Sequence, residues 1–204
     1  MGRTSDAKER LMEAVQGLIW TGSYGTTTID QICEKAGVKK GSFYYFFESK
    51  ADLALAAIEV DWNARREVLD HIFSPSKPPM DRIRDFLADG MKTQEAMKAQ
   101  CGYVLGCPLC TLGAEVCTME QALRAKIQEV MEGVRKYLES AVRDAKAAGI
   151  AHVADEILAT QTLWAYYEGL LTQARITNDL GVLRGGWDGT LTLLGVRTEA
   201  MATV

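Results

Sequence analysis

The fold of this chain is decided by residues 27–53, which read TTIDQICEKAGVKKGSFYYFFESKADL. Thr28 and Gln31 have the spacing of a helix-capping box, and Gly37 stands where a helix ends in a left-handed residue. After a short turn, a further short helix is expected over about 42–47. Two helices joined by a tight, glycine-containing turn predict a helix-turn-helix, whose second helix enters the major groove of DNA.

The helix expected over 42–47 includes five consecutive aromatic residues. A helical wheel places its phenylalanines together, Tyr45 nearly opposite them and Tyr44 on the flank. The phenylalanines are expected to anchor the helix in a core, which leaves small residues, hydroxyls and lysines to face a major groove. A helix that serves packing alone would account for the phenylalanines only. The residues expected to meet DNA are Thr27, Thr28, Lys39, Lys40, Gly41, Ser42 and Tyr45. The threonines belong to this set because backbone N–H groups at a helix N-terminus suit a phosphate.

The chain is acidic as a whole, with a formal net charge of −4 over 204 residues. An acidic balance by itself argues against a nucleic-acid partner. Residues 1–50, however, hold seven basic and six acidic side chains, a balance of +1, so that residues 51–204 carry −5. Attraction to phosphate is short-ranged at cellular salt, and the local charge therefore decides. We expect a small DNA-binding domain followed by a larger, acidic region.

Composition and patterning favour an all-α protein. Hydrophobic residues make up 48% of the chain and charged residues 25%, which is typical of a globular protein and excludes a disordered one. No segment alternates convincingly between apolar and polar residues. No run of eighteen apolar residues occurs, and charged residues precede any apolar stretch at the start, so we expect no membrane partner, no secretory signal and a cytoplasmic location.

Two domains are expected. The first, residues 1–50, is a three-helix, helix-turn-helix DNA-binding domain, and the second, residues 51–204, is a helical effector-binding and dimerisation domain. After a first helix that ends near residue 22, and the two helices above, the remaining helices are expected at about 49–73, 80–98, 108–117, 119–148, 153–177 and 180–197. A homodimer through the last two of them is expected, because Ala165 and Gly169 are small residues four apart that allow close helix approach.

Residues 5–55 resemble the N-terminal domain of the TetR family of transcriptional regulators, on the stretch quoted above. The resemblance implies an all-helical homodimer that binds a palindromic double-stranded DNA operator and is released by a small-molecule effector. By position it assigns groove contacts to Lys40, Gly41 and Ser42, phosphate contacts to Thr28, Tyr44 and Lys50, and either role to Tyr45. Phe46 departs from the histidine often found at its position, so no contact is assigned to it.

Four of the five cysteines, Cys101, Cys107, Cys110 and Cys117, lie within seventeen residues. Proline is favoured at the first position of a helix, so Pro108 would place Cys107 at the N-cap and Cys110 in the first turn, where a thiolate is stabilised. A metal site is one interpretation, although this spacing converges poorly along one helix. A thiol-disulfide oxidoreductase using Cys107 and Cys110 is another, although its usual βαβ context is missing. Simple packing is the third.

Gly106-Cys107-Pro108-Leu109, with the residues up to Cys117, is similar to a TetR branch of N-ethylmaleimide-responsive repressors. Some members of that branch sense electrophiles or oxidants through this cysteine, which a lysine on a later helix can partner. Arg175 stands at the comparable place here. An arginine can favour a thiolate electrostatically, but it is not expected to form the same covalent bond. Modification of the Cys107 thiol by an electrophilic effector is therefore a hypothesis.

An effector cavity is expected in the second domain, although Met and aromatic residues at helical spacing are also typical of a core. The candidates to line it are Trp62, Phe86, Met91, Met97, Tyr103, Trp164 and Tyr167, with Glu168 and Arg175 for polar recognition. No catalytic constellation, metal site or cofactor is expected. The sequence as a whole predicts a DNA-binding transcriptional regulator, a repressor rather than an enzyme, and the thiol-disulfide oxidoreductase is the alternative.

Overall fold

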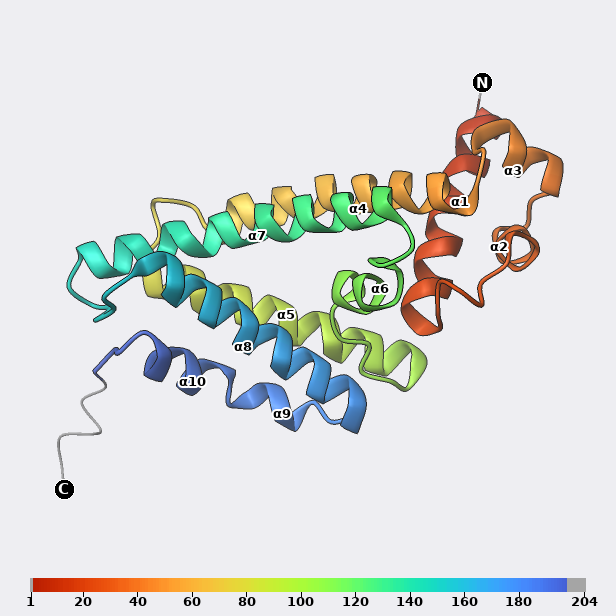
Figure 1. Cartoon of the computed structure of the whole chain (residues 1–204). Coiled ribbons are helices and arrows are strands. Elements are labelled where there is room, and N and C mark those ends of the chain that lie inside the picture. The colour runs from red at the N-terminus through yellow and green to blue at the C-terminus, as the bar shows by residue number, and fades with distance from the viewer. Residues whose placement is uncertain (1, 198–204) are drawn as a thin grey trace. The chain divides into compact units, whose positions relative to one another are not determined.

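The computed structural model describes residues 2–197, and all regular secondary structure in that range is helical (Figure 1). The all-α prediction is confirmed. The helices are α1 (Gly2–Thr21), α2 (Ile29–Ala36), α3 (Lys40–Phe46), α4 (Lys50–Ile72), α5 (Pro79–Cys101), α6 (Pro108–Val116), α7 (Gln121–Ala147), α8 (Glu156–Thr177), α9 (Gly181–Arg184) and α10 (Gly186–Leu193). Over residues 2–197, each helix is too short or too polar to cross a membrane.

The chain divides into two compact units. The first comprises the chain up to Arg66 together with Pro108–Met131, and the second comprises Glu67–Cys107 together with the chain from Glu132 onward. By packing, α6 and the start of α7 therefore belong with the helix-turn-helix, although they lie far beyond residue 50 in the sequence. The functional boundary at residue 50 stays a prediction.

The core of the first unit joins the helix-turn-helix to α6. Leu11 of α1, Ile32 of α2 and Phe43 of α3 are completely buried in it. Leu112 and Val116 of α6 enter the same core, and Figure 1 shows α6 beside α1. The apolar face of α6 therefore packs against the helices of the DNA-binding part of the chain.

Local signals set the ends of α2 and α3. The Thr28 hydroxyl accepts a hydrogen bond from the Gln31 N–H, the Gln31 side chain accepts one from the Thr28 N–H, and Gly37 is left-handed at φ 62°. The predicted capping box and stop are confirmed. The next helix begins at Lys40, two residues earlier than predicted, because the Ser42 N–H already bonds to the Lys39 carbonyl.

The second unit packs α8 against α9 and α10, with α5 beside α10 (Figure 1). The single helix predicted over 180–197 is wrong, because the structure has two short helices there, α9 and α10, which meet at Gly185. Three glycines within six positions, Gly181, Gly185 and Gly186, weaken a continuous helix, and the chain after α10 turns at Gly195 with φ 62°.

Candidate functional site

The recognition helix α3 has one buried and one exposed side. Phe43 and Phe47 are buried, whereas the side chains of Tyr44 and Tyr45 are 55% and 74% exposed. The ring of Tyr44 packs edge-on against Phe43, and that of Tyr45 packs edge-on against Phe46. The two exposed phenols are thus held in place by the aromatic anchor beneath them. This is the orientation that the helical wheel predicted.

Lys40, at the start of α3, forms an ion pair with Asp30 in the first turn of α2. The Lys40 Nζ lies 2.8 Å from the Asp30 Oδ1, and both side chains are exposed. This hydrogen bond to the carboxylate raises the pKa of Lys40 above its ordinary value. Sequence reasoning missed Asp30, since nothing in a ten-residue separation indicates that the two side chains meet.

The two candidate threonines differ in their placement. Thr27 is buried, and its hydroxyl donates a hydrogen bond of 2.6 Å to the Ser23 carbonyl. Thr27 therefore stabilises the turn, and we do not retain it among the proposed DNA contacts. Thr28 is exposed at the N-terminus of α2, where its hydroxyl caps the helix.

Lys50 ties the turn between α1 and α2 to the start of α4. Its ammonium donates hydrogen bonds of 2.6 Å to the Tyr24 carbonyl and 2.8 Å to the Thr27 carbonyl. Burial lowers the pKa of Lys50, and the Glu115 and Glu120 carboxylates counteract only part of that effect. Lys50 thus has a structural role, and its contact with a phosphate stays a prediction.

Glu115 of α6 also binds the turn between α1 and α2, through its carboxylate. Its carboxylate accepts hydrogen bonds from the Ser23 hydroxyl at 2.6 Å, the Tyr24 N–H at 2.9 Å and the Gly25 N–H at 2.6 Å. Burial alone would raise the pKa of Glu115, but these hydrogen bonds and the charge of Lys50 hold it below its ordinary value. The partners lie 90 to 92 positions apart, and no signal in the sequence predicts that they meet.

The segment that leads to Cys107 lies in the second unit, where buried Gln94 of α5 fixes its backbone. The Gln94 Oε1 accepts hydrogen bonds from the N–H groups of Leu105 and Gly106, at 3.1 and 2.8 Å, and its Nε2 donates to the Gly106 carbonyl. Gly106 has φ 67°, and a Cβ there would lie 3.2 Å from the Leu171 carbonyl oxygen. The segment needs glycine at this position.

The C-terminal end of α8 completes this support. Arg175 donates a hydrogen bond to the Leu105 carbonyl, and the Asn178 side chain accepts one from the Val104 N–H. Arg175 thus acts on the backbone two residues before Cys107. Its electrostatic effect on the thiol stays a prediction.

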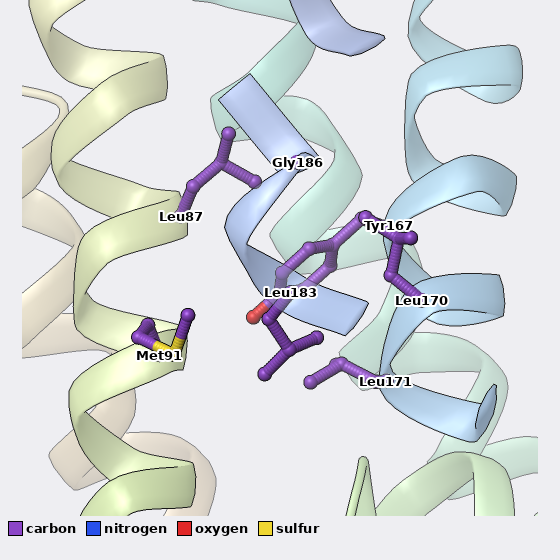
Figure 2. Close-up of a pocket in the computed structure, with 7 residues that line it drawn as sticks. All are labelled: Leu87, Met91, Tyr167, Leu170, Leu171, Leu183 and Gly186. Atoms are coloured by element: carbon purple, nitrogen blue, oxygen red, sulfur yellow. The ribbon is translucent and has the colours of Figure 1, made fainter. Parts of the chain in front are cut away.

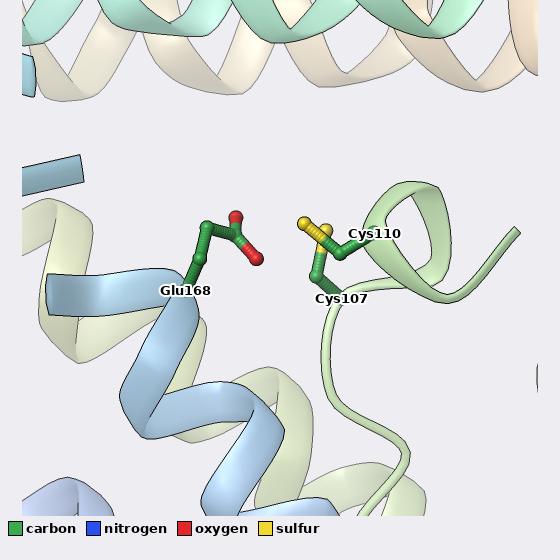
Figure 3. Close-up of side chains that lie close together, drawn as sticks. All are labelled: Cys107, Cys110 and Glu168. Atoms are coloured by element: carbon green, nitrogen blue, oxygen red, sulfur yellow. The ribbon is translucent and has the colours of Figure 1, made fainter. Parts of the chain in front are cut away.

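Cys107 directly precedes Pro108, the first residue of α6, as the sequence predicted. The Cys107 sulfur and a Glu168 carboxylate oxygen lie within 4.8 Å of each other, and Figure 3 shows the two side chains pointing toward one another. Cys110 and Cys117 belong to the first unit, and both are half-buried. The pairing of a carboxylate with Cys107 was not predicted.

A pocket in the second unit lies between α5, α8 and the last two helices (Figure 2). The space among its lining side chains is about 250 Å³ with open solvent included, so that only part of it is enclosed, and its walls are mainly apolar. Its lining residues are Leu87, Met91, Tyr167, Leu170, Leu171, Leu183 and Gly186. Two of the predicted effector residues, Met91 and Tyr167, are among them.

The other predicted effector residues lie outside this pocket. Trp62 is buried in the first unit with the Arg66 guanidinium over its ring, and Trp164 packs against the Tyr167 ring at 6.2 Å between centroids. Phe86 is buried, also against Tyr167. Tyr103 is 64% exposed. The remaining candidate, Met97, is half-buried on α5.

Comparison with known proteins decides the family. Residues 11–57 match the family model described as bacterial regulatory proteins, tetR family. Residues 79–187, more than half of the chain, match that of the tetracyclin repressor-like C-terminal domain. The chain belongs to the TetR family. The TetR-family resemblance and the all-helical fold expected from it are confirmed, and this TetR-family protein is a DNA-binding transcriptional regulator.

Its similarity to individual relatives is moderate. The transcriptional regulator AcuR of Cereibacter sphaeroides is 30% identical over 155 residues, which are 75% of this chain and 69% of AcuR. The transcriptional repressor NemR of Escherichia coli is 24% identical over 176 residues, 84% and 85% of the two chains. The crystal structure of reduced E. coli NemR has a TM-score of 0.80 at 22% identity, covering 94% of this chain and 100% of that one. These relatives are named as regulators, which favours this function over the thiol-disulfide oxidoreductase.

Proposed function

We propose that this TetR-family regulator is a homodimeric, cytoplasmic repressor that binds a palindromic operator and is released by an effector. The observation that carries the DNA-binding part is the two-sided recognition helix. Its aromatic anchor, Phe43 and Phe47, is buried, while Tyr44 and Tyr45 are exposed and Lys40 pairs with Asp30 in the first turn of α2. Small residues at the start of α3 let the helix approach base edges closely.

Groove and phosphate contacts are divided along this surface. We assign groove contacts to Lys40, Gly41, Ser42 and Tyr45, and phosphate contacts to Thr28, Lys39, Tyr44 and Lys50. Phosphate contacts carry no sequence information, whereas base contacts do. The second set should therefore support binding to every DNA sequence, and the first set should also determine which sequence is preferred.

The dimer is assigned to α8 and α10. Leu158 and Ile176 of α8, 60% and 78% exposed, are five helical turns apart and therefore on one face. Ala165 and Gly169 lie between them in the sequence and offer no bulk against close approach. An interface of two helices from each subunit would be isologous, and its symmetry would place the two recognition helices about 34–36 Å apart, one turn of DNA.

Two routes of release are supported by separate features of the second unit. The Cys107 thiol stands at the start of α6 on a backbone segment held by Gln94 and Arg175, which suits a thiol that acts at a defined position. The pocket beside Tyr167 suits a small, uncharged and mainly apolar molecule, because its lining is aliphatic apart from one phenol and one methionine.

The experiment selects duplexes from a random-sequence library with the wild-type protein and measures affinity by fluorescence anisotropy. We expect a palindrome, binding as a dimer, and affinity that falls steeply with salt. Tyr44→Ala should weaken all duplexes about equally, whereas Ser42→Ala should change the ranking of duplexes that differ at single base pairs. A selection that enriches no common sequence would contradict the proposal. So would an equal loss on every duplex for both variants.

A further inference from the structure

The turn between α1 and α2 is fastened to α6 by a carboxylate. Glu115 accepts three hydrogen bonds from consecutive residues of that turn, one from a side chain and two from backbone N–H groups. An ionised carboxylate makes stronger hydrogen bonds than a neutral acceptor does, and its lowered pKa keeps it ionised at neutral pH. The turn leads directly into α2, on which Thr28 and Asp30 stand.

Gly25 shows how close this contact is. A Cβ on Gly25 would lie 2.9 Å from the Glu115 Oε1, so a side chain there would displace the carboxylate from its present position. With glycine at this position, the carboxylate stays close to the backbone of the turn. Lys50 completes the arrangement, because it holds the Tyr24 carbonyl while Glu115 holds the Tyr24 N–H.

The helix that carries Glu115 is itself anchored in the DNA-binding part of the chain. Leu112 and Val116, three residues before and one after Glu115, are buried in the core shared with α1, α2 and α3. The inward face of α6 thus holds two apolar anchors and one charged anchor. At its other end, α6 begins at Pro108, immediately after Cys107, and it is only nine residues long.

We propose that Glu115 is a positioning residue for DNA recognition, which fixes the turn before α2 to α6 and passes a displacement of α6 on to α2 and α3. The positioning role stands on the described contacts alone. Its regulatory part rests on the proposed function, because it takes modification of Cys107 as the signal that displaces α6. One short helix then connects the modified residue with the turn.

The first measurement tests positioning and uses Glu115→Ala, Glu115→Gln and Glu13→Ala in the full-length protein. Glu115→Ala should speed hydrogen exchange at the Tyr24 and Gly25 amides and weaken operator binding by roughly tenfold, the effect of about one lost charge-assisted hydrogen bond. Glu115→Gln keeps one acceptor oxygen for Ser23 and Gly25 but turns an NH2 donor toward the Tyr24 N–H, so both properties should lie between those of the wild type and Glu115→Ala. Glu13→Ala removes the same charge from an exposed position on α1, away from the turn, and should leave both near wild type.

If Glu115→Ala fails to fold, Ser23→Ala tests the same contact, because it removes the hydroxyl that donates to Glu115, together with a longer 3.4 Å hydrogen bond that this hydroxyl accepts from the Thr26 N–H. We then expect smaller changes of the same sign in amide exchange at Gly25 and in DNA affinity. The positioning role would be overturned if Glu115→Ala had the amide exchange rates and the operator affinity of the wild type. Where Glu115→Ala does not fold, the same outcome in Ser23→Ala would overturn it.

The second measurement tests coupling and uses N-ethylmaleimide as the probe. The ratio of operator affinities before and after alkylation is measured for the wild type, Cys107→Ser and Glu115→Ala, with mass spectrometry to verify that Cys107 is alkylated equally where present. We expect a loss of affinity in the wild type, none in Cys107→Ser, and a several-fold smaller ratio in Glu115→Ala. An unchanged ratio in Glu115→Ala would overturn coupling through this residue. A wild type that does not respond to alkylation would instead refute thiol-triggered release, while amide exchange still decides the positioning role.

Discussion

The ammonium of Lys50 lies 4.2 Å from the centre of the Tyr24 ring and donates a 2.6 Å hydrogen bond to the Tyr24 carbonyl. The residue that the family resemblance assigns to a DNA phosphate is therefore also a structural tie across the turn before α2. Burial, with the nearby carboxylates of Glu120 and Glu115, raises the pKa of Tyr24 to about 12, which keeps the phenol neutral under the lysine. DNA affinity and the order of the turn are thus linked at one side chain.

Replacing Lys50 by methionine is expected to destabilise the fold as well as weaken DNA binding. The change leaves the Tyr24 and Thr27 carbonyls without their donor, and a part-buried group left unbonded costs about 1–3 kcal/mol. Urea unfolding measures the free-energy difference. Lys39→Met is the matched control, because Lys39 is exposed, and we expect its effect to stay within about 0.5 kcal/mol. Equal stability of the two variants would contradict the structural role of Lys50.

Asp30 is expected to limit binding to non-specific DNA. Its carboxylate occupies the Lys40 ammonium at 2.8 Å and so competes with DNA for it. Asp30→Asn should therefore strengthen binding to a random-sequence duplex about threefold to tenfold and steepen the salt dependence by about 0.9 per released lysine, as counterion release requires. Anisotropy titrations at several salt concentrations measure both quantities.

The Asp30 effect has to depend on Lys40. In a Lys40→Met background, Asp30→Asn should change the affinity no more than Glu34→Gln does, since Glu34 carries the same charge one turn further along α2. If Asp30→Asn strengthens binding equally with and without Lys40, general charge repulsion is the cause and the ion pair is irrelevant.

Local signals explain why the helix-turn-helix could be predicted from the sequence. The capping residues Thr28 and Gln31, the stop at Gly37 and the division of α3 into a buried and an exposed side each depend on neighbours within a few positions. Two other features depend on partners about ninety positions away in the sequence: the hydrogen bonds of Glu115 to the turn, and the packing of α6 in the core of the first unit. No periodicity in the sequence predicts which residues pair over such a separation. The role of Gln94 could not be predicted for the same reason, because its side-chain amide bonds to a backbone segment that comes close to it only in the folded chain.

The face of α8 that carries Leu158 and Ile176 is expected to be the dimer interface. Ile176→Asp places a charge on that face, and a buried unpaired charge is strongly unfavourable, so the variant should be monomeric in light scattering. Operator affinity should fall by at least about 100-fold, because the DNA-binding domain of a second subunit no longer contributes to binding. Val68→Asp, at another exposed apolar residue, is the control and should remain dimeric. A dimeric Ile176→Asp would place the interface elsewhere.

Glu168 is expected to restrain the reactivity of Cys107. A carboxylate within 4.8 Å of the sulfur repels the negative charge that a thiol acquires before it attacks an electrophile. Glu168→Gln should therefore increase the rate of Cys107 alkylation by N-ethylmaleimide several-fold. Mass spectrometry of the peptide that contains Cys107 measures this rate. Glu95→Gln, an exposed carboxylate on α5, serves as the control for net charge. A slower reaction in Glu168→Gln would show that the carboxylate instead assists the thiol.

The lowered pKa of Glu115 predicts how stability depends on pH. The hydrogen bonds from Ser23, Gly25 and Tyr24 favour the ionised carboxylate in the folded state, so the folded-state pKa lies below the ordinary value of 4.5. A carboxylate of this kind contributes stability above its unfolded-state pKa, and the contribution is lost as the pH falls through the folded-state pKa. Thermal unfolding below pH 4.5 should therefore show a smaller drop in Tm for Glu115→Gln than for the wild type, whereas Glu13→Gln, at an exposed position, should follow the wild type. Parallel Tm profiles for the wild type and Glu115→Gln would mean that the carboxylate is held no more strongly in the folded chain than in the unfolded one.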